Sequence, residues 1–321
     1  MNYQVQGIIQ GHDSKALAKA NEINRIEHAG PYGLAFISAD ARFKLWIGLA
    51  LLSLVIGEIF LADMVHLTGL VQILGCWPGL AVLAGCYIYC GLRPFPKLRD
   101  VCELLIWAVL VTNILALLFP IASRNQRPFV DSTLAAMDGR LHFSTAFAAH
   151  FIAQSPAIGA TSNIAYGLMI PLILAALFIP TICGHPLESR RFIAAIAIAA
   201  LVTAAITALW PSAGPWVTEN IEPTKAQAGV TAYLARLHSA APVALDLENA
   251  GIVSFPSFHV VFAVLAAWAL RSFRHIRVCG WLAAGLVVVS TITTGWHYGV
   301  DVLAGLALSA LSIVVARKAA R

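Results

Sequence analysis

The sequence predicts an all-α polytopic membrane protein with about eight transmembrane helices. Hydrophobic residues make up 59% of the 321-residue chain and charged residues only 12%. Soluble globular domains carry about 25% charged residues, so this composition excludes an ordinary soluble enzyme. The formal net charge is +5, but the basic residues are scattered between apolar runs. That pattern is typical of membrane topology and argues against a nucleic-acid partner.

Apolar runs give the positions of the predicted helices. About 20 residues are needed to cross the hydrocarbon core of a bilayer. The sequence contains eight such candidates, of which the sixth and the eighth are short. They are residues 45–62, 71–92, 101–121, 164–183, 192–209, 257–270, 278–296 and 300–316.

The distribution of Lys and Arg predicts the orientation of these helices. All but five of the 21 basic residues fall in the two terminal segments and in alternate loops; the five others are Arg124, Arg127, Arg140, Lys225 and Arg236. Cytoplasmic loops are the ones enriched in Lys and Arg. We therefore expect both termini in the cytoplasm, in a protein of the plasma or inner membrane.

Two long loops lie on the predicted non-cytoplasmic side. In the first, 122–163, apolar residues recur at helical spacing over 130–151, which predicts a helix along the membrane surface. The second, 211–256, is rich in Pro, Gly and Ala and is expected to fold over the helix ends as a lid. The six cysteines lie in or beside apolar runs without a C-x-x-C pair, so we expect neither a disulfide nor a metal.

The informative polar residues lie where these loops meet the last three predicted helices. The segment SFPSFH begins at Ser254 and opens the sixth helix, and the segment TGWHYGVD ends at Asp301 and joins the seventh helix to the eighth. The predicted topology brings His259, His297 and Asp301 to one depth on the non-cytoplasmic side. Ionisable groups at such positions are costly and indicate a functional site.

The spacing of these residues suits phosphate transfer. If residues 297–301 are helical, His297 and Asp301 share a face, and the carboxylate can accept the Nδ1–H of the imidazole. Nε2 is then free as a nucleophile. His259 follows Pro256 in the first turn of a helix, where backbone N–H groups favour phosphate. Ser257 would lie beside that phosphate, and a protonated His259 can donate its proton to a leaving oxygen.

Two segments resemble the signatures of a known family. PSFH at 256–259 resembles the P-S-G-H signature of the type 2 phosphatidic acid phosphatase superfamily. HYGVD at 297–301 resembles the H-x-x-x-D of the third signature of that superfamily. Either motif alone is weak, whereas the pair at this separation is specific.

The resemblance is closer still to the branch that includes inositol phosphorylceramide synthase. SFPSFH and TGWHYGVD are similar to the forms found in that branch, as is PFVD at 128–131 followed by AMD at 136–138. The resemblance covers residues 127–316 and implies a six-helix catalytic bundle formed by the third to eighth helices. The expected parts are a cytoplasmic segment (1–44), two accessory helices (45–100) and a catalytic membrane domain (101–321).

The resemblance also implies roles for the polar residues. His297 is the expected nucleophile, which forms a phosphohistidine, Asp301 orients it, and His259 protonates the leaving group. No metal or other cofactor is implied. Tyr298 and Ser257 are expected to bind substrate.

The chain departs from the family pattern in its cations and in one glycine. Phe258 replaces the glycine of P-S-G-H, and Thr291 replaces the arginine six residues before the catalytic histidine. The first signature, K-x6-R-P, is not present in clean form, which leaves Arg127 as the candidate cation. Fewer cations favour a phosphodiester, which carries one charge, over a monoester with nearly two. Tyr166, at the start of the fourth helix, is a further candidate for the lining of the site.

We therefore expect a membrane phosphotransferase or phosphatase acting on a lipid phosphate ester, favouring head-group transfer of the sphingolipid or inositol phospholipid type. The acceptor is water, a ceramide-like or diacylglycerol alcohol, or a sugar or polyol. A lipid phosphomonoesterase for phosphatidic acid or polyprenyl diphosphate is an open alternative, and so is a transporter with a proton relay. A transporter would carry ionisable residues along the pore depth, whereas these gather at one face. The expected partners are lipids, and the oligomeric state stays open.

Overall fold

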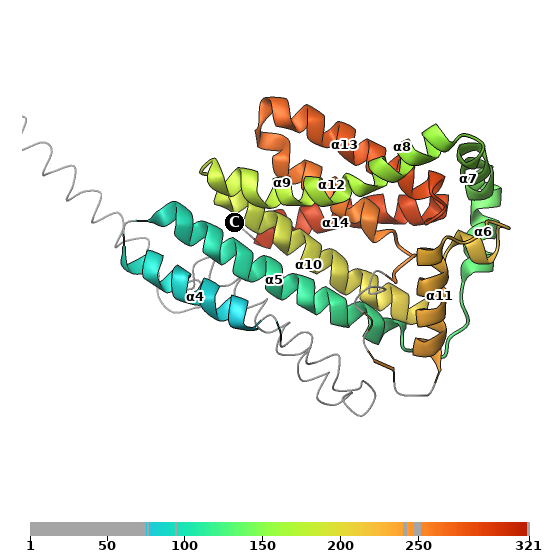
Figure 1. The fold of residues 1–321 in the computed structure, drawn as a ribbon, viewed down its shortest axis with the longest axis horizontal. Helices are drawn as coiled ribbons and strands as arrows, with labels where there is room; N and C mark the ends of the chain where they lie inside the picture. The colour runs from blue at the N-terminus through green and yellow to red at the C-terminus, as the bar shows by residue number, and fades with distance from the viewer. Residues whose placement is uncertain are drawn as a thin grey trace, which may run out of the picture. The chain divides into compact units, whose positions relative to one another are not determined.

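The computed structural model describes residues 75, 77–93, 95–239, 243, 244, 246 and 252–319. Over these residues the fold is built from helices joined by loops, as the sequence predicts (Figure 1). The predicted cytoplasmic segment and the first predicted helix, 45–62, lie outside the described residues.

Five helical segments of the described chain are long and apolar enough to cross a membrane. Three of them begin with a proline in the first turn, where its missing N–H costs nothing. The five are α5 (Pro96–Ser123), α8 (Pro156–Gly167) continued by α9 (Met169–Ile182), α10 (Pro186–Leu209), α13 (Arg274–Thr293) and α14 (Gly299–Ala319). The shorter apolar helices are α4 (Trp77–Leu92) and α12 (Phe258–Ala269), which η3 (Leu270–Ser272) extends.

These helices confirm the predicted fold class. Each of the seven predicted spans from 71–92 onward coincides with one of them, and six form the bundle expected for the catalytic part. The predicted fourth span is longer than expected, because its helix begins at Pro156 instead of residue 164.

Helix α10 and helix α12 form the centre of the bundle. Helix α10 packs against α5, α9, α12 and α14, and α12 packs against α9, α13 and α14. The buried face of α10 is rich in alanine, which lets neighbouring backbones approach closely. A close approach joins α12 to α14: a Cβ on Gly305 would lie 2.7 Å from the carbonyl oxygen of Ser257. Glycine is therefore required at this crossing.

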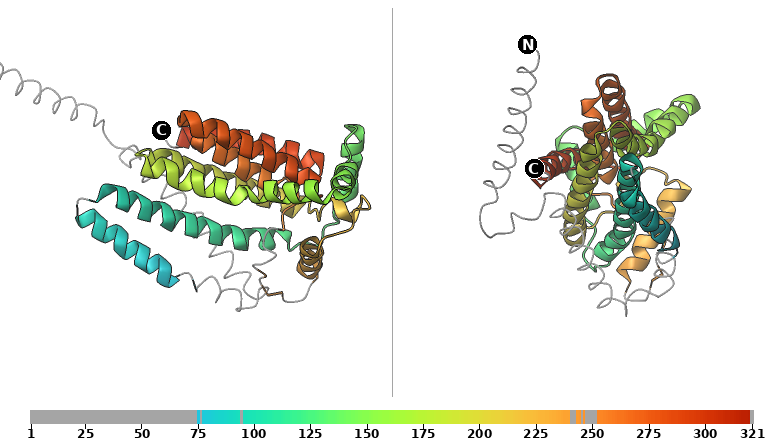
Figure 2. Two further views of the ribbon diagram at one scale, coloured as in Figure 1. Left: turned by 45° about the horizontal axis from the view of Figure 1, so that its top comes forward. Right: turned by 90° about the vertical axis from the view of Figure 1, so that its left-hand side faces the viewer.

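Four short helices gather at one end of the bundle, across the direction of the long helices (Figures 1 and 2). This end, called the capped end below, is where α5, α10 and α13 finish and where α8, α12 and α14 begin. The short helices are α6 (Asp131–Arg140), α7 (Thr145–Ala153), η2 (Pro215–Val217) and α11 (Lys225–His238). The last two belong to the predicted lid, whose described part thus lies over the helix ends.

The prediction of a single surface helix over residues 130–151 is wrong, because the segment forms two helices. Helix α6 ends at Arg140, and His142 adopts a left-handed conformation with φ of 55°. Ser144 then begins α7 by accepting a hydrogen bond from the backbone N–H of Phe147. The apolar periodicity continues through the turn, so it did not reveal the break.

Candidate active site

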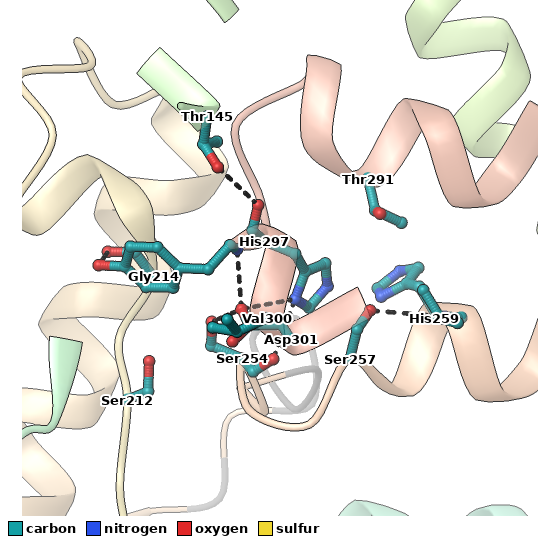
Figure 3. Close-up of polar contacts among 12 residues, drawn as sticks. Thr145, Ser212, Gly214, Ser254, Ser257, His259, Thr291, His297, Val300 and Asp301 are labelled. Atoms are coloured by element: carbon teal, nitrogen blue, oxygen red, sulfur yellow. Dashed lines mark hydrogen bonds and ion pairs between the residues drawn. The ribbon is translucent and has the colours of Figure 1, made fainter. Parts of the chain in front are cut away.

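The three residues predicted to form the site meet at the capped end (Figure 3). His259 lies in the first turn of α12, His297 in the loop between α13 and α14, and Asp301 in the first turn of α14. The imidazole centroids of His259 and His297 are 5.7 Å apart, and Nδ1 of His297 is 3.5 Å from a carboxylate oxygen of Asp301. The topology thus brings together segments that are far apart in sequence.

The tautomer of His297 follows from its nearest neighbour. Nδ1 lies 2.9 Å from the carbonyl oxygen of Ser254, closer than it lies to Asp301. A carbonyl only accepts hydrogen bonds, so Nδ1 carries the hydrogen and Nε2 keeps its lone pair. Burial in this loop lowers the pKa of His297 to about 4, against a smaller opposing effect of the Ser254 hydrogen bond. The ring is therefore neutral near pH 7, as a nucleophile must be.

Asp301 holds the surroundings of His297 in place. Its side chain is fully buried, and Oδ2 accepts hydrogen bonds from the backbone N–H of Tyr298 at 2.9 Å and from the hydroxyl of Ser254 at 3.3 Å. Its carbonyl accepts from the backbone N–H of Ser257 at 3.1 Å. Oδ1 has no hydrogen-bond partner among the described residues. Asp301 therefore ties the start of α14 to the start of α12 and places a carboxyl group beside His297.

Other elements hold the loop that carries His297. Its backbone N–H donates to Thr291 of α13, and its carbonyl accepts from the hydroxyl of Thr145 on α7 at 3.3 Å. The side chain of Gln227 on α11 donates to the carbonyl of Gly295 at 3.2 Å. Gly295 has a φ of 71°, which glycine adopts without strain. Cap helices and membrane helices thus fix this loop jointly.

Three carboxylates organise the capped end. Asp138 accepts from the backbone N–H groups of Gly299 and Val300 at 2.7 and 2.8 Å, at the N-terminus of α14. Glu219 accepts from the N–H of Ala146 at 2.7 Å, at the N-terminus of α7. Both positions suit negative charge, because helix N-termini carry unpaired N–H groups and a positive dipole end. Burial nevertheless raises the pKa of Asp138 and of Glu219.

Asp131 is the third of these carboxylates. It accepts hydrogen bonds from the hydroxyl of Ser212 and from the backbone N–H groups of Ala213 and Gly214. Asp131 thus holds the loop that follows α10. The sequence resemblance included Asp131 and Asp138 without giving them a role. Their spacing of seven residues, which places both on one face of a helix, was the available signal.

The structure gives each of the three predicted substrate-binding residues a contact within the protein. Ser257 is fully buried and caps α12 by accepting from the N–H of Val260. Tyr298 is also fully buried, and its hydroxyl lies 2.6 Å from that of Thr218 and 3.3 Å from Asp131. Arg127 is exposed, and its backbone N–H donates to Asn125. Substrate binding by Ser257, Tyr298 and Arg127 stays a prediction.

Sequence reasoning gave little weight to one residue that contacts the site directly. The hydroxyl of Tyr166, on α8, is 2.6 Å from Nε2 of His259, and the two rings are 4.6 Å apart. Within the described residues no cluster of three His, Cys, Asp or Glu residues is arranged to hold a metal ion. The expected independence from metals stays a prediction.

Comparison with known families agrees with this geometry. A family model described as PAP2 superfamily matches residues 132–315, which is more than half of the chain and includes both histidines and Asp301. No curated protein and no solved structure matches the chain. This superfamily comprises helical membrane enzymes that act on phosphate esters as phosphatases or phosphotransferases. The chain belongs to the PAP2 superfamily and is an integral membrane enzyme of this phosphatase type.

Proposed function

We propose that this enzyme transfers a phosphodiester head group from a membrane lipid to an alcohol acceptor, as in the inositol phosphorylceramide synthase-like branch. The observation that carries the proposal is the contact between Nδ1 of His297 and the carbonyl of Ser254. It leaves Nε2 of His297 as a fixed nucleophile, with the ring of His259 5.7 Å away across the site.

The reaction then proceeds in two balanced steps. The lone pair on Nε2 of His297 attacks phosphorus, and the bond from phosphorus to the leaving oxygen breaks as His259 gives that oxygen a proton. In the second step His259 takes the proton of the acceptor hydroxyl, whose oxygen attacks phosphorus and releases His297. Asp301 supplies negative charge beside the imidazolium that His297 becomes.

The preference for a diester rests on charge. Thr291 occupies the position of the family arginine, and its hydroxyl is bound to the carbonyl of Val288 in its own helix. The N-terminus of α12 supplies backbone N–H groups and a partial positive charge beside His259. This modest charge suits the single negative charge of a diester better than the nearly double charge of a monoester.

The preference for lipids rests on the surroundings of the site. Helix α7 packs against α8 and α13 at the capped end and exposes Phe147 and Phe151, which are 73% and 56% accessible. Such side chains insert readily at the edge of a bilayer. The distribution of basic residues supports a capped end on the non-cytoplasmic side, with both termini in the cytoplasm.

A lipid phosphomonoesterase is the second candidate, because the superfamily is one of phosphatase-type enzymes. The two reactions differ in where the phosphorus ends. Purified protein in mixed micelles is given a phospholipid with ³²P in its diester, with and without ceramide, and separately ³²P-phosphatidic acid. Label in a new lipid that requires ceramide supports transfer, whereas free phosphate from phosphatidic acid alone contradicts it. His297→Ala is the matched control and should give neither product.

A further inference from the structure

His259 and His297 have partners of different chemical kinds, and this difference indicates a role for Tyr166. The partner of His297 is the backbone carbonyl of Ser254, which only accepts hydrogen bonds. The partner of His259 is the hydroxyl of Tyr166, 2.6 Å from Nε2, and a hydroxyl both donates and accepts. His297 is therefore held with its hydrogen on Nδ1, whereas the hydroxyl of Tyr166 is bonded to the ring of His259 through Nε2.

This distinction matches the two tasks of the reaction. A nucleophile needs a lone pair on one nitrogen at all times. A residue that gives a proton in the first step and takes one in the second must be held in place both as a cation and as a neutral ring. Because Tyr166 occupies Nε2 of His259, the proton is given and taken at Nδ1, and the Tyr166 hydroxyl accepts from the Nε2–H of the ring in both its charged and its neutral form.

Aromatic packing holds the ring of Tyr166 independently of its hydroxyl. Tyr166 stacks on Trp296 with centroids 6.3 Å apart and planes 18° apart, and Trp296 meets Trp216 edge to face at 5.4 Å. Trp216 is itself fixed by a hydrogen bond from Nε1 to the hydroxyl of Thr231. Replacing Tyr166 with phenylalanine thus removes the hydroxyl and keeps the packed ring.

We propose that Tyr166 is a positioning residue for the acid–base function of His259, a proposal that rests on the proposed histidine mechanism. The hydroxyl keeps the His259 ring aligned while the proton moves from His259 to the leaving oxygen and later from the acceptor hydroxyl to His259. Tyr166 acts through His259 and takes no part in the bond from His297 to phosphorus.

The test compares a poor leaving group with a good one. General acid catalysis contributes about 10²–10⁴-fold and matters little when the leaving group needs no proton. Tyr166→Phe should lower kcat about 10- to 100-fold for an alkyl ester, part of that contribution, but less than about 3-fold for a nitrophenyl ester. In a His259→Ala background the same change should have no further effect, because the two residues act as one unit.

Two further variants keep the test decisive. Tyr233→Phe removes another buried tyrosine hydroxyl, which accepts from the N–H of Asp246, and should show no dependence on the leaving group. Tyr166→His, with a planar ring that donates and accepts, should recover part of the activity on the alkyl ester.

The proposal would be overturned if Tyr166→Phe lost equal activity on both esters. It would also be overturned if adding Tyr166→Phe to His259→Ala caused a full additional loss. The comparison uses whichever ester class the wild type cleaves, so it remains valid if the enzyme proves to be a monoesterase. Failure of head-group transfer is thereby distinguished from failure of the Tyr166 proposal.

Discussion

Nδ1 of His297 lies 2.9 Å from the carbonyl oxygen of Ser254 and 3.5 Å from the nearer carboxylate oxygen of Asp301. The backbone carbonyl, which no side-chain substitution removes, is therefore the closer acceptor. Asp301 bonds more closely to the N–H of Tyr298, at 2.9 Å. The closest acceptor for the imidazole and the carboxyl group beside it are thus two different groups.

This division predicts a moderate effect of Asp301→Asn. In a Ser-His-Asp triad the corresponding change reverses the tautomer and lowers kcat by about 10⁴. Here the Ser254 carbonyl preserves the tautomer, so we expect a loss of about 10²-fold, the scale of one lost electrostatic contact in an active site. Steady-state kinetics measure the loss, and ³¹P NMR of the trapped intermediate should still show phosphorus on Nε2. A 10⁴-fold loss or phosphorus on Nδ1 would contradict the assignment.

The two histidines should respond differently to the leaving group. A nitrophenyl phosphodiester should partly restore activity to His259→Ala, because its leaving group needs no proton. It should not restore His297→Ala, which lacks the nucleophile. Acid-labile phosphohistidine should accumulate in His259→Ala and be absent from His297→Ala. Label on residue 259, or rescue of His297→Ala, would reverse the roles.

Asp138→Asn should destabilise the capped end. Asp138 receives two backbone N–H groups at the start of α14, and the amide of asparagine leaves one of them without an acceptor. The expected cost is about 1–2 kcal/mol, measured as a lower melting temperature in detergent. Glu222→Gln changes an exposed carboxylate in the segment before α11 and should leave the melting temperature unchanged.

The same variant has a predicted dependence on pH. Burial raises the pKa of Asp138, so the folded protein binds this proton more tightly than the unfolded chain does. The stabilisation from this group is complete below the unfolded pKa of about 4 and is lost as the pH rises through the folded pKa. The stability difference between the wild type and Asp138→Asn should therefore grow on acidification. A difference that shrinks toward acid pH would disprove this.

Gly305→Ala should separate α12 from α14. The added methyl group would lie 2.7 Å from the carbonyl oxygen of Ser257, a backbone atom that cannot rotate away. Overpacking of this kind costs about 1–3 kcal/mol, and here it would also displace Asp301 relative to His259. Gly285→Ala on α13 is the control, because a Cβ there has nothing within 4 Å. Equal melting temperatures and equal activities for the two variants would refute the close-packing argument.

Cysteine labelling tests the proposed orientation. Ser239→Cys lies just after α11 at the capped end, and Ser272→Cys lies at the opposite end of α12. In a background in which the native cysteines are replaced by serine, an impermeant thiol reagent should label the first from outside intact cells and the second only after permeabilisation. Labelling of both from one side would contradict the predicted topology.

Hydrophobicity made most of the membrane fold predictable. Seven predicted spans coincide with helices because bilayer thickness sets both the length and the composition of such runs. The start of α8 was missed because residues 156–163 are, apart from Ile158, small, polar or proline, although their backbone is helical. The break between α6 and α7 depends on the conformation of His142 and the cap at Ser144, which apolar periodicity does not register.

The site was predictable in part for a similar reason. Helix topology alone places His259, His297 and Asp301 at one end, so their convergence follows from the spans. Side-chain direction does not follow from the spans. Tyr298 adjoins His297 in sequence, yet its hydroxyl points toward Asp131 and Thr218, whereas Tyr166 reaches His259 from a helix 93 residues away.

The loop between α13 and α14 has a consequence for biogenesis. It is anchored by Thr145, Gln227 and Asp138, which precede it in the chain, and by Asp301, which follows it. During synthesis the early anchors emerge well before the last helix enters the bilayer. We therefore expect the loop that carries His297 to gain its last anchor, Asp301, only when the final helix docks.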